Sequence, residues 1–460
     1  MRYWIGILAC ICTAATAQPL SLLQAWQRVE TVSDKLQAEH QAENRAAAEL
    51  GAAEQLGMPS LSLSGSYTRL DKPIELDSRA INPIGDLLQL PQVGAIAGQL
   101  GLDLSELNWK TELTDRDIYH ASLKAVWPLY VGGRIEAAQA IKAAELDQQK
   151  QQGELSRQER FTTLVERYFA VVLSTQVEQL QRQRLQTLTE HLQHAEAMQK
   201  QGQIAEVERL NAQVAMEQGQ VALSQARRRS KLAHMALNTL LQQNQVDTAQ
   251  GLGLPLTQPD LDRWQRQMLE VHPALALYHA KEAQAQGAID AEKGRYKPEV
   301  ALFGNYTLET QDTLAAELEP DWLVGVTVKV PLFTNDGRSD RVRAAKSAQL
   351  QVQHLRAQTQ QDLELLMASR GQELSQAQHE YRALATAEKL AKENLRLRKL
   401  AFSQGLSTSI EQVDASDKLL EVQTARAAAQ YRYLVALGQL AAMSSNQQRL
   451  FQLLERTESE

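Results

Sequence analysis

The chain has 460 residues, of which 43% are hydrophobic and only 5% are aromatic, and its mean hydropathy is -0.37. This composition argues against several compact globular domains and is typical of extended helices that pack along narrow seams. The formal net charge of -7 gives no electrostatic reason to expect a nucleic-acid partner.

The first segment predicts a secretory signal peptide at residues 1–17. Arg2 precedes a short apolar stretch that is followed by Ala-Thr-Ala, a pattern that fits cleavage after Ala17. The only two cysteines, Cys10 and Cys12, lie in this segment, so the exported chain is expected to have no disulfide and no cysteine metal site. No later stretch approaches 18 consecutive apolar residues, and a membrane-spanning helix is not expected.

The next predicted element is a strand at about residues 59–70, where residue types alternate strictly. Ser or Thr stands at every even position from Ser60 to Thr68, and Leu, Gly or Tyr stands at the odd positions between them. Such a period of two gives a strand two unlike faces. In a soluble sandwich the apolar face would meet a core, whereas in an outer-membrane barrel it would meet lipid while the hydroxyl face lined a wet lumen. The strand alone does not decide between the two.

The alternating pattern returns three times and predicts further strands at about residues 119–130, 298–308 and 322–333. The segment KPEVALFGNYTLE repeats the spacing of proline, glycine and tyrosine in the first strand, and WLVGVTVKVPLF repeats YHASLKAVWPLY of the second. Tilted strands of this length rise about 25 Å, the height of the apolar band of an outer membrane. The residues expected to face lipid are Leu61, Leu63, Tyr67, Val300, Leu302 and Tyr306.

Long segments without proline follow the second and the fourth strand and predict long helices. No proline occurs between Pro128 and Pro255 or after Pro331, which permits uninterrupted helices. Each segment has one predicted break, at a glycine turn near residue 202 or residue 405. Each half of the chain therefore contains two strands followed by a helical hairpin.

These halves predict two tandem repeats, at residues 18–245 and 263–445. A linker at 246–262 joins them, and a C-terminal tail at 446–460 follows. Four strands cannot close a barrel in lipid, because barrels of this type start at about eight strands and an open edge leaves backbone groups unpaired. Several chains are therefore expected to share one barrel, with helices of about 90 Å projecting into an aqueous space.

This order of strands, helices and glycine turns resembles the TolC family of outer-membrane efflux proteins. The segments AEVERLNA and SIEQVDA, which follow the two turns, are similar to the family's helix–turn signatures. The resemblance implies a mixed, mostly α-helical fold: a homotrimer with a twelve-stranded transmembrane β-barrel, continued by a long periplasmic α-helical coiled-coil barrel. It also implies location in the outer membrane of a Gram-negative bacterium, with the helices in the periplasm.

The function that this resemblance implies is passive conduction in a tripartite efflux or type I secretion system. The implied partners are a periplasmic adaptor (membrane-fusion) protein, an inner-membrane pump or ABC exporter, and outer-membrane lipid. The sequence contains no nucleophile elbow, phosphate loop or HExxH motif, so neither enzymatic activity nor a cofactor is expected. A periplasmic structural coiled-coil protein or an adaptor without a pore is the alternative.

The resemblance also suggests functional residues at the two turns. Glu411 and Asp414 match acidic positions that ring the narrow tunnel mouth, although a solvated outer face is the alternative for both. Glu208 matches the acidic partner of an arginine and a tyrosine that close the tip in the family's prototype. Those two positions are Ser407 and Phe402 in this chain, so the prototype's closing ion pair is not expected.

Gly202 and Gly405 at the turns are interpreted either as helix caps alone or also as docking points for the tips of the adaptor. His191 and His194 are spaced by three residues but have no third ligand at metal spacing. We therefore expect both histidines to be solvated residues on a helix surface.

Overall fold

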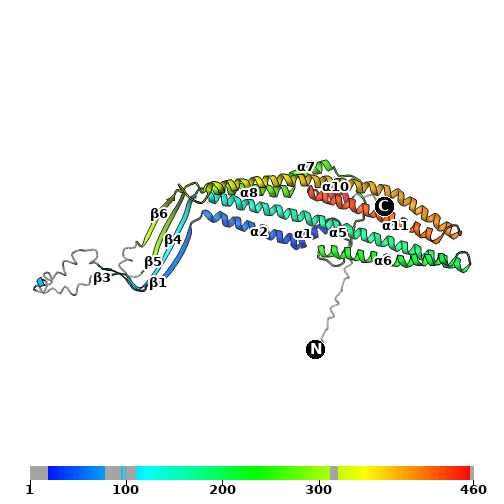
Figure 1. The fold of residues 1–460 in the computed structure, drawn as a ribbon, viewed down its shortest axis with the longest axis horizontal. Helices are drawn as coiled ribbons and strands as arrows, with labels where there is room; N and C mark the ends of the chain where they lie inside the picture. Colours follow the sequence, from blue (N-terminus) through cyan, green and yellow to red (C-terminus); the bar gives the residue numbers. More distant parts are fainter. Residues whose placement is uncertain (1–18, 78–94, 97–98, 100–109, 311–319, 456–460) are drawn as a thin grey trace, which may run out of the picture. The chain divides into compact units, whose positions relative to one another are not determined.

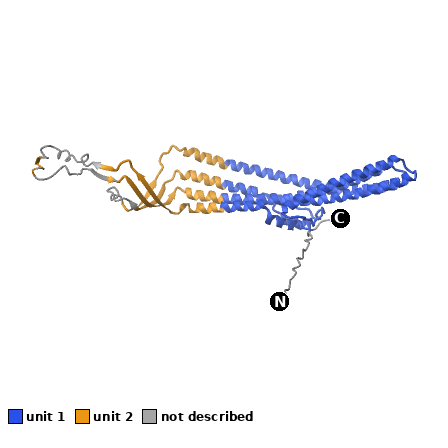
Figure 2. Ribbon diagram, turned by 90° about the horizontal axis from the view of Figure 1, so that it is seen from below, with its two compact units in different colours: residues 1–46, 145–282, 350–460 blue, residues 47–144, 283–349 orange. Residues whose placement is uncertain are grey.

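The computed structural model describes residues 19–77, 95–96, 99, 110–310 and 320–455. The predicted signal peptide at 1–17 lies outside the described residues. The chain divides into two compact units (Figure 2). Unit 1 comprises residues 1–46, 145–282 and 350–460, and unit 2 comprises residues 47–144 and 283–349.

Unit 2 contains a four-stranded antiparallel sheet in the order β1–β4–β5–β6 (Figure 1). Its strands are β1 (Ser60–Arg69), β4 (Asp117–Val131), β5 (Glu299–Thr310) and β6 (Trp322–Lys329). The expected fold class, mostly helical with four long strands per chain, is confirmed. A second, two-stranded sheet pairs β2 (Ile74–Asp77) with β3 (Lys110–Thr114), in a segment where the sequence analysis expected no strand.

The strand register gathers apolar residues on one side of the four-stranded sheet, here called the apolar face. Leu63 pairs with Leu123, which pairs in turn with Tyr306, and Tyr306 lies opposite Trp322. Directly paired residues lie on the same side of a sheet, so all four strands contribute to this face. Its large members are Leu61, Leu63, Tyr67, Tyr119, Leu123, Trp127, Val300, Leu302, Tyr306, Trp322, Val324, Val326 and Val328. No core covers its β1 part, where Leu61 and Leu63 are 69% and 70% exposed.

The opposite side of the sheet, here called the polar face, carries the serines of β1. The Ser60 hydroxyl donates to the carbonyl of Val126 at 3.2 Å, and the hydroxyl oxygens of Ser64 and Ser122 are 3.1 Å apart. These side chains therefore hydrogen-bond with the adjacent strand β4 as well as giving the face its polar character.

Equivalent arginines begin the two longest helices. Arg134, the first residue of α5, forms an ion pair with Glu299 of β5 at 2.7 Å. Arg338, the first residue of α10, donates to the carbonyls of Pro331 and Arg295 at 3.2 and 3.3 Å. Each arginine thus attaches the start of a long helix to the polypeptide beside the sheet, although the two use different partners.

The long helices form two hairpins whose turns lie in unit 1, at the same end of that unit (Figure 1). The first hairpin consists of α5 (Arg134–Lys200) and α6 (Glu206–Leu241), and the second of α10 (Arg338–Ser403) and α11 (Ser409–Met443). Among the described helices, none is long and apolar enough to cross a membrane.

Shorter helices complete the chain. They are α1 (Leu22–Val32), α2 (Asp34–Glu54), the 3-10 helix η1 (Gln55–Gly57), α7 (Leu261–Val271), α8 (Pro273–Gly294) and α12 (Gln447–Leu454). In the core of unit 1, Phe161 of α5 packs edge-on against Trp26 of α1 at 5.0 Å and against Phe451 of α12 at 5.9 Å between ring centroids. Residues 447–454 lie in the predicted C-terminal tail, and the apolar side of the helix that they form is buried in this core.

Candidate functional site at the hairpin tips

Both hairpins turn through the same backbone motif. At the end of α5, Gly202 has φ +75°, and the N–H of Gln203 donates to the carbonyl of Met198. At the end of α10, Gly405 has φ +74°, and the N–H of Leu406 donates to the carbonyl of Ala401. A left-handed glycine followed by this six-to-one hydrogen bond is the Schellman motif. A Cβ at either glycine would meet no atom within 4 Å, so only the backbone angle requires glycine.

Glu411, a predicted gate residue, caps the start of α11. Its carboxylate accepts hydrogen bonds from the Ser407 hydroxyl at 2.6 Å and from the backbone N–H of Thr408 at 3.1 Å, and the Thr408 side chain completes a capping box. Arg398 of α10 lies 3.0 Å from the same carboxylate. The hydrogen bond from Ser407, then that from Thr408, hold the pKa of Glu411 below its usual value. The negative charge of Glu411 is therefore balanced within its own hairpin, by hydrogen-bond donors and by Arg398.

Glu208, the third predicted gate residue, connects the two hairpins. It lies in the first turn of α6, and its carboxylate accepts the backbone N–H of Ser409, the first residue of α11, at 2.6 Å. A carboxylate is favoured at a helix N-terminus because the N–H groups there have no partner within the helix. Glu208 therefore caps a helix of the other hairpin.

His191 is buried between the hairpins, so the prediction that it is a solvated surface residue is wrong. Its side chain is 1% exposed, its Nε2 lies 2.6 Å from the Ser409 hydroxyl, and its ring packs edge-on against Phe402 at 4.6 Å. Burial, reinforced by His194 and Lys399, lowers the pKa of His191 to about 4. His194, by contrast, is exposed as expected.

Asp414 differs from the other two carboxylates at the tips. Its side chain is exposed, and within the described part of the chain it forms no ion pair. One turn further along α11, Asp417 pairs with the largely buried Arg184 of α5 at 2.5 Å. The hairpins are thus joined at several points, and Asp414 is left facing solvent in one chain.

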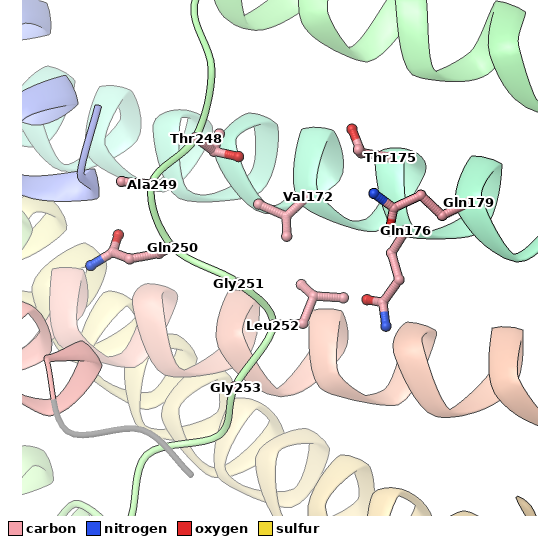
Figure 3. A pocket seen from close by; sticks show the side chains of 10 residues that line it. All are labelled: Val172, Thr175, Gln176, Gln179, Thr248, Ala249, Gln250, Gly251, Leu252 and Gly253. Carbon is pink, nitrogen blue, oxygen red and sulfur yellow. The ribbon is translucent and has the colours of Figure 1, made fainter. Parts of the chain in front are cut away.

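A separate cavity of about 490 Å³ lies between α5 and the segment at residues 248–253 (Figure 3). Gln176 and Gln179 of α5 face this segment beside Leu252, and none of the ten lining residues is ionisable. Over the residues that the structure describes, no group of three His, Cys, Asp or Glu side chains could hold a metal ion. The cavity offers no acid, base or metal ligand set for catalysis.

Comparison with known proteins identifies the family. A family model described as "Outer membrane efflux protein" matches residues 26–242 and 264–446. The chain belongs to this family. No curated protein sequence matches the chain.

Solved outer-membrane proteins share the fold. The Vibrio cholerae protein VceC is 15% identical with a TM-score of 0.73, covering 92% of this chain and 96% of its own. CmeC of Campylobacter jejuni is 14% identical with a TM-score of 0.69, and the match covers 95% of this chain and 90% of CmeC. MtrE of Neisseria gonorrhoeae, solved in an open state, is 18% identical with a TM-score of 0.69, and the match covers 93% of this chain and 89% of MtrE.

Family membership confirms the function expected from the resemblance. The protein is an outer-membrane efflux channel of a Gram-negative bacterium, a transport protein and not an enzyme. The alternative of a periplasmic coiled-coil or adaptor protein without a pore is excluded.

Proposed function

We propose that three copies of the chain form one conduit for efflux cargo, with a shared twelve-stranded barrel in the outer membrane. The sheet order leaves one side of β1 and one side of β6 without a strand partner within the described chain. Backbone groups at such an edge are costly in lipid, where no water can satisfy them. Pairing β6 of one copy with β1 of the next removes both edges, and channels of this family form trimers.

The apolar face supplies the surface that meets lipid in this assembly. It includes the six residues expected to do so, Leu61, Leu63, Tyr67, Val300, Leu302 and Tyr306. The serines of β1 then line the lumen, because they lie on the opposite face. A continuous apolar face across four strands, with its β1 part exposed in one chain, supports this orientation.

Exposed apolar residues at heptad spacing support contacts between copies along the helices. Val207, Val214 and Val221 follow one another at intervals of seven on α6 and are all exposed, as are Leu390 and Leu397 on α10. Such rows pack into the grooves of a neighbouring helix in coiled coils. We assign these rows to the seams between copies.

At the tunnel mouth we assign the role of an unpaired, pore-facing carboxylate to Asp414. Glu411 and Glu208 are assigned a structural role. Three copies bring three exposed Asp414 carboxylates together, whereas Glu411 is matched by Arg398 and Glu208 by a helix N-terminus. A ring of unmatched carboxylates attracts cations and disfavours anions. The expected ring of two carboxylates per chain, Glu411 and Asp414, is thereby reduced to Asp414 alone.

The turns at Gly202 and Gly405 are proposed to dock a periplasmic adaptor, which connects the channel to an inner-membrane pump or ABC exporter. Leu406 and Ile410 beside the second turn are exposed apolar side chains, and Leu406 is 77% exposed. Clustered apolar groups at a helix tip are suited to contact with another helical tip.

Fractionation and electrophoresis test the assembly. The full-length protein is expected in the outer-membrane fraction, to migrate as a trimer when unheated and as a monomer after boiling, and to conduct in planar bilayers. The single observation that carries the proposal is the pair of unpaired sheet edges beside an apolar face. A monomeric protein recovered from the periplasm would contradict it.

A further inference from the structure

Ser409, the first residue of α11, is held by both helices of the other hairpin. Its hydroxyl lies 2.6 Å from Nε2 of His191 on α5, and its backbone N–H donates to Glu208 on α6 at 2.6 Å. All three residues belong to unit 1. Any separation of the two hairpin tips must therefore break both contacts.

His191 makes its contact in the neutral form. Its Nδ1 is buried and has no hydrogen-bond partner among the described residues. A neutral imidazole has one donor and one acceptor nitrogen, and an unpaired buried N–H is rarer than an unpaired acceptor. We therefore assign the hydrogen to Nε2, which donates to the Ser409 hydroxyl, and the lone pair to Nδ1. A second proton would create a buried N–H at Nδ1 with no acceptor.

The charged groups around the ring do not favour a second proton. His194 on α5 and Lys399 on α10 both act against it. The carboxylate of Glu208 on α6 is occupied by the N-terminus of α11, and Glu411 on α11 is occupied by its capping box and Arg398. Burial and the two cationic neighbours together lower the pKa of His191 from 6.5 to about 4.

We propose that His191 is a proton-sensitive clasp, which joins the hairpin tips when neutral and releases them when protonated. The inference rests on the proposed function, which places these tips at the mouth of the tunnel. The joined form binds the proton weakly. A separated form exposes the imidazole ring to water and therefore binds the proton more strongly. Acidification from pH 6.5 towards pH 4 therefore favours separation, by up to about tenfold per pH unit. Above pH 6.5 the equilibrium does not respond.

A distance measurement across the tips tests the clasp without requiring conduction. Spin labels on the full-length protein at Gln201→Cys and Gln404→Cys report on the exposed turns of the two hairpins. We expect the parent distance distribution to shift to longer distances between pH 7.5 and pH 4.5. His191→Gln keeps an N–H that can donate to Ser409 but cannot titrate, and its distances should not respond.

Two further variants separate the clasp from a purely structural role. Ser409→Ala removes the partner of His191 and should increase the separated fraction already at pH 7.5. His194→Gln changes an exposed histidine one turn away and should retain the response to acid.

Equal responses of the parent and His191→Gln, or no response of the parent, would overturn the inference. A conducting trimer whose labels do not respond disproves the clasp alone. Labels that respond as expected in a protein that forms no pore would instead disprove the proposed conduit.

Discussion

Gly132 and Gly294 approach each other so closely that neither has room for a side chain. A Cβ on Gly132 would clash with the carbonyl oxygen of Gly294, and a Cβ on Gly294 would lie 2.8 Å from the carbonyl oxygen of Gly132. The contact joins the residue after β4 to the last residue of α8, within unit 2. The first long helix thus starts from a backbone contact that only glycine permits.

Gly132→Ala should therefore destabilise the protein more than Gly202→Ala. The two glycines have nearly equal φ angles, +73° and +75°, but only Gly132 faces a backbone atom. The left-handed angle alone costs about 1 to 2 kcal/mol for alanine, and the clash adds to that cost at Gly132. Apparent unfolding midpoints of the two variants provide the measurement, and equal losses would show that the close contact has no energetic role.

Tyr168→Phe is expected to destabilise unit 1. The buried Tyr168 hydroxyl donates to the carbonyl of Leu20 at 2.7 Å and accepts the backbone N–H groups of Ala249 and Gln250, each at 3.1 Å. Removing it leaves the partly buried N–H of Gln250 without this acceptor, at a cost of about 1 kcal/mol. The Ala249 N–H and the Leu20 carbonyl keep their mutual hydrogen bond at 3.0 Å. The same burial raises the pKa of Tyr168 to about 12, so the hydroxyl keeps its proton at neutral pH.

Tyr433→Phe is the matched control for this prediction. Tyr433 is equally buried, but its hydroxyl has no hydrogen-bond partner among the described residues. Removing an unpaired polar atom should be neutral or stabilising. The prediction fails if thermal unfolding shows the two substitutions to be equally damaging.

Leu63→Arg should reduce assembly in the outer membrane more than Ser64→Arg. Leu63 lies on the apolar face, whereas Ser64 lies on the polar face one residue away. An arginine facing lipid at mid-bilayer costs about 2 to 4 kcal/mol, and one facing a lumen costs less. The amount of heat-modifiable trimer in outer-membrane fractions compares the two variants. Equal amounts of trimer would contradict the assigned orientation of the two faces.

Asp414→Asn should alter ion selectivity, whereas Glu411→Gln should mainly weaken the start of α11. Of the three carboxylates of Glu208, Glu411 and Asp414, only that of Asp414 has no partner within the described residues, so its removal takes net charge from the mouth. Because the Debye length is about 10 Å at 0.1 M salt, the effect should be local. Cation preference and block by multivalent cations in planar bilayers provide the readout. Changes with Glu411→Gln but not with Asp414→Asn would contradict the assignment.

The strands were predictable because their signal is local. Ser–Leu alternation in β1 states which residues share a face, and the repeated proline, glycine and tyrosine spacing locates β5. Strand β3 lacks that alternation, and β2 shows it over only four residues, which is too short to predict a strand. In α12, Leu450, Phe451, Leu453 and Leu454 form an apolar side at helical spacing, a signal that the tail interpretation overlooked.

The clasp was not predictable, because its parts lie far apart in the sequence. His191 and Ser409 are separated by 218 positions in the sequence, and no local pattern pairs them. One available signal was that His191 stands three residues after Leu188 and four before Ala195, the spacing of a helix seam. Both of those neighbours are buried in the structure. A histidine at such a position is expected to be buried in the interface between helices.

Cross-linking of the sheet edges between copies tests most directly whether three chains share one barrel. The only cysteines, Cys10 and Cys12, lie in the predicted signal peptide. Once that segment is cleaved, a disulfide can form only between introduced cysteines. Leu63→Cys on β1 can be combined in turn with cysteine at Val324, Val326 or Val328 on β6. We predict that at least one pair yields covalent dimers and trimers upon oxidation and no larger species. Monomers alone with every pair, or a ladder that continues beyond the trimer, would contradict a closed three-chain barrel.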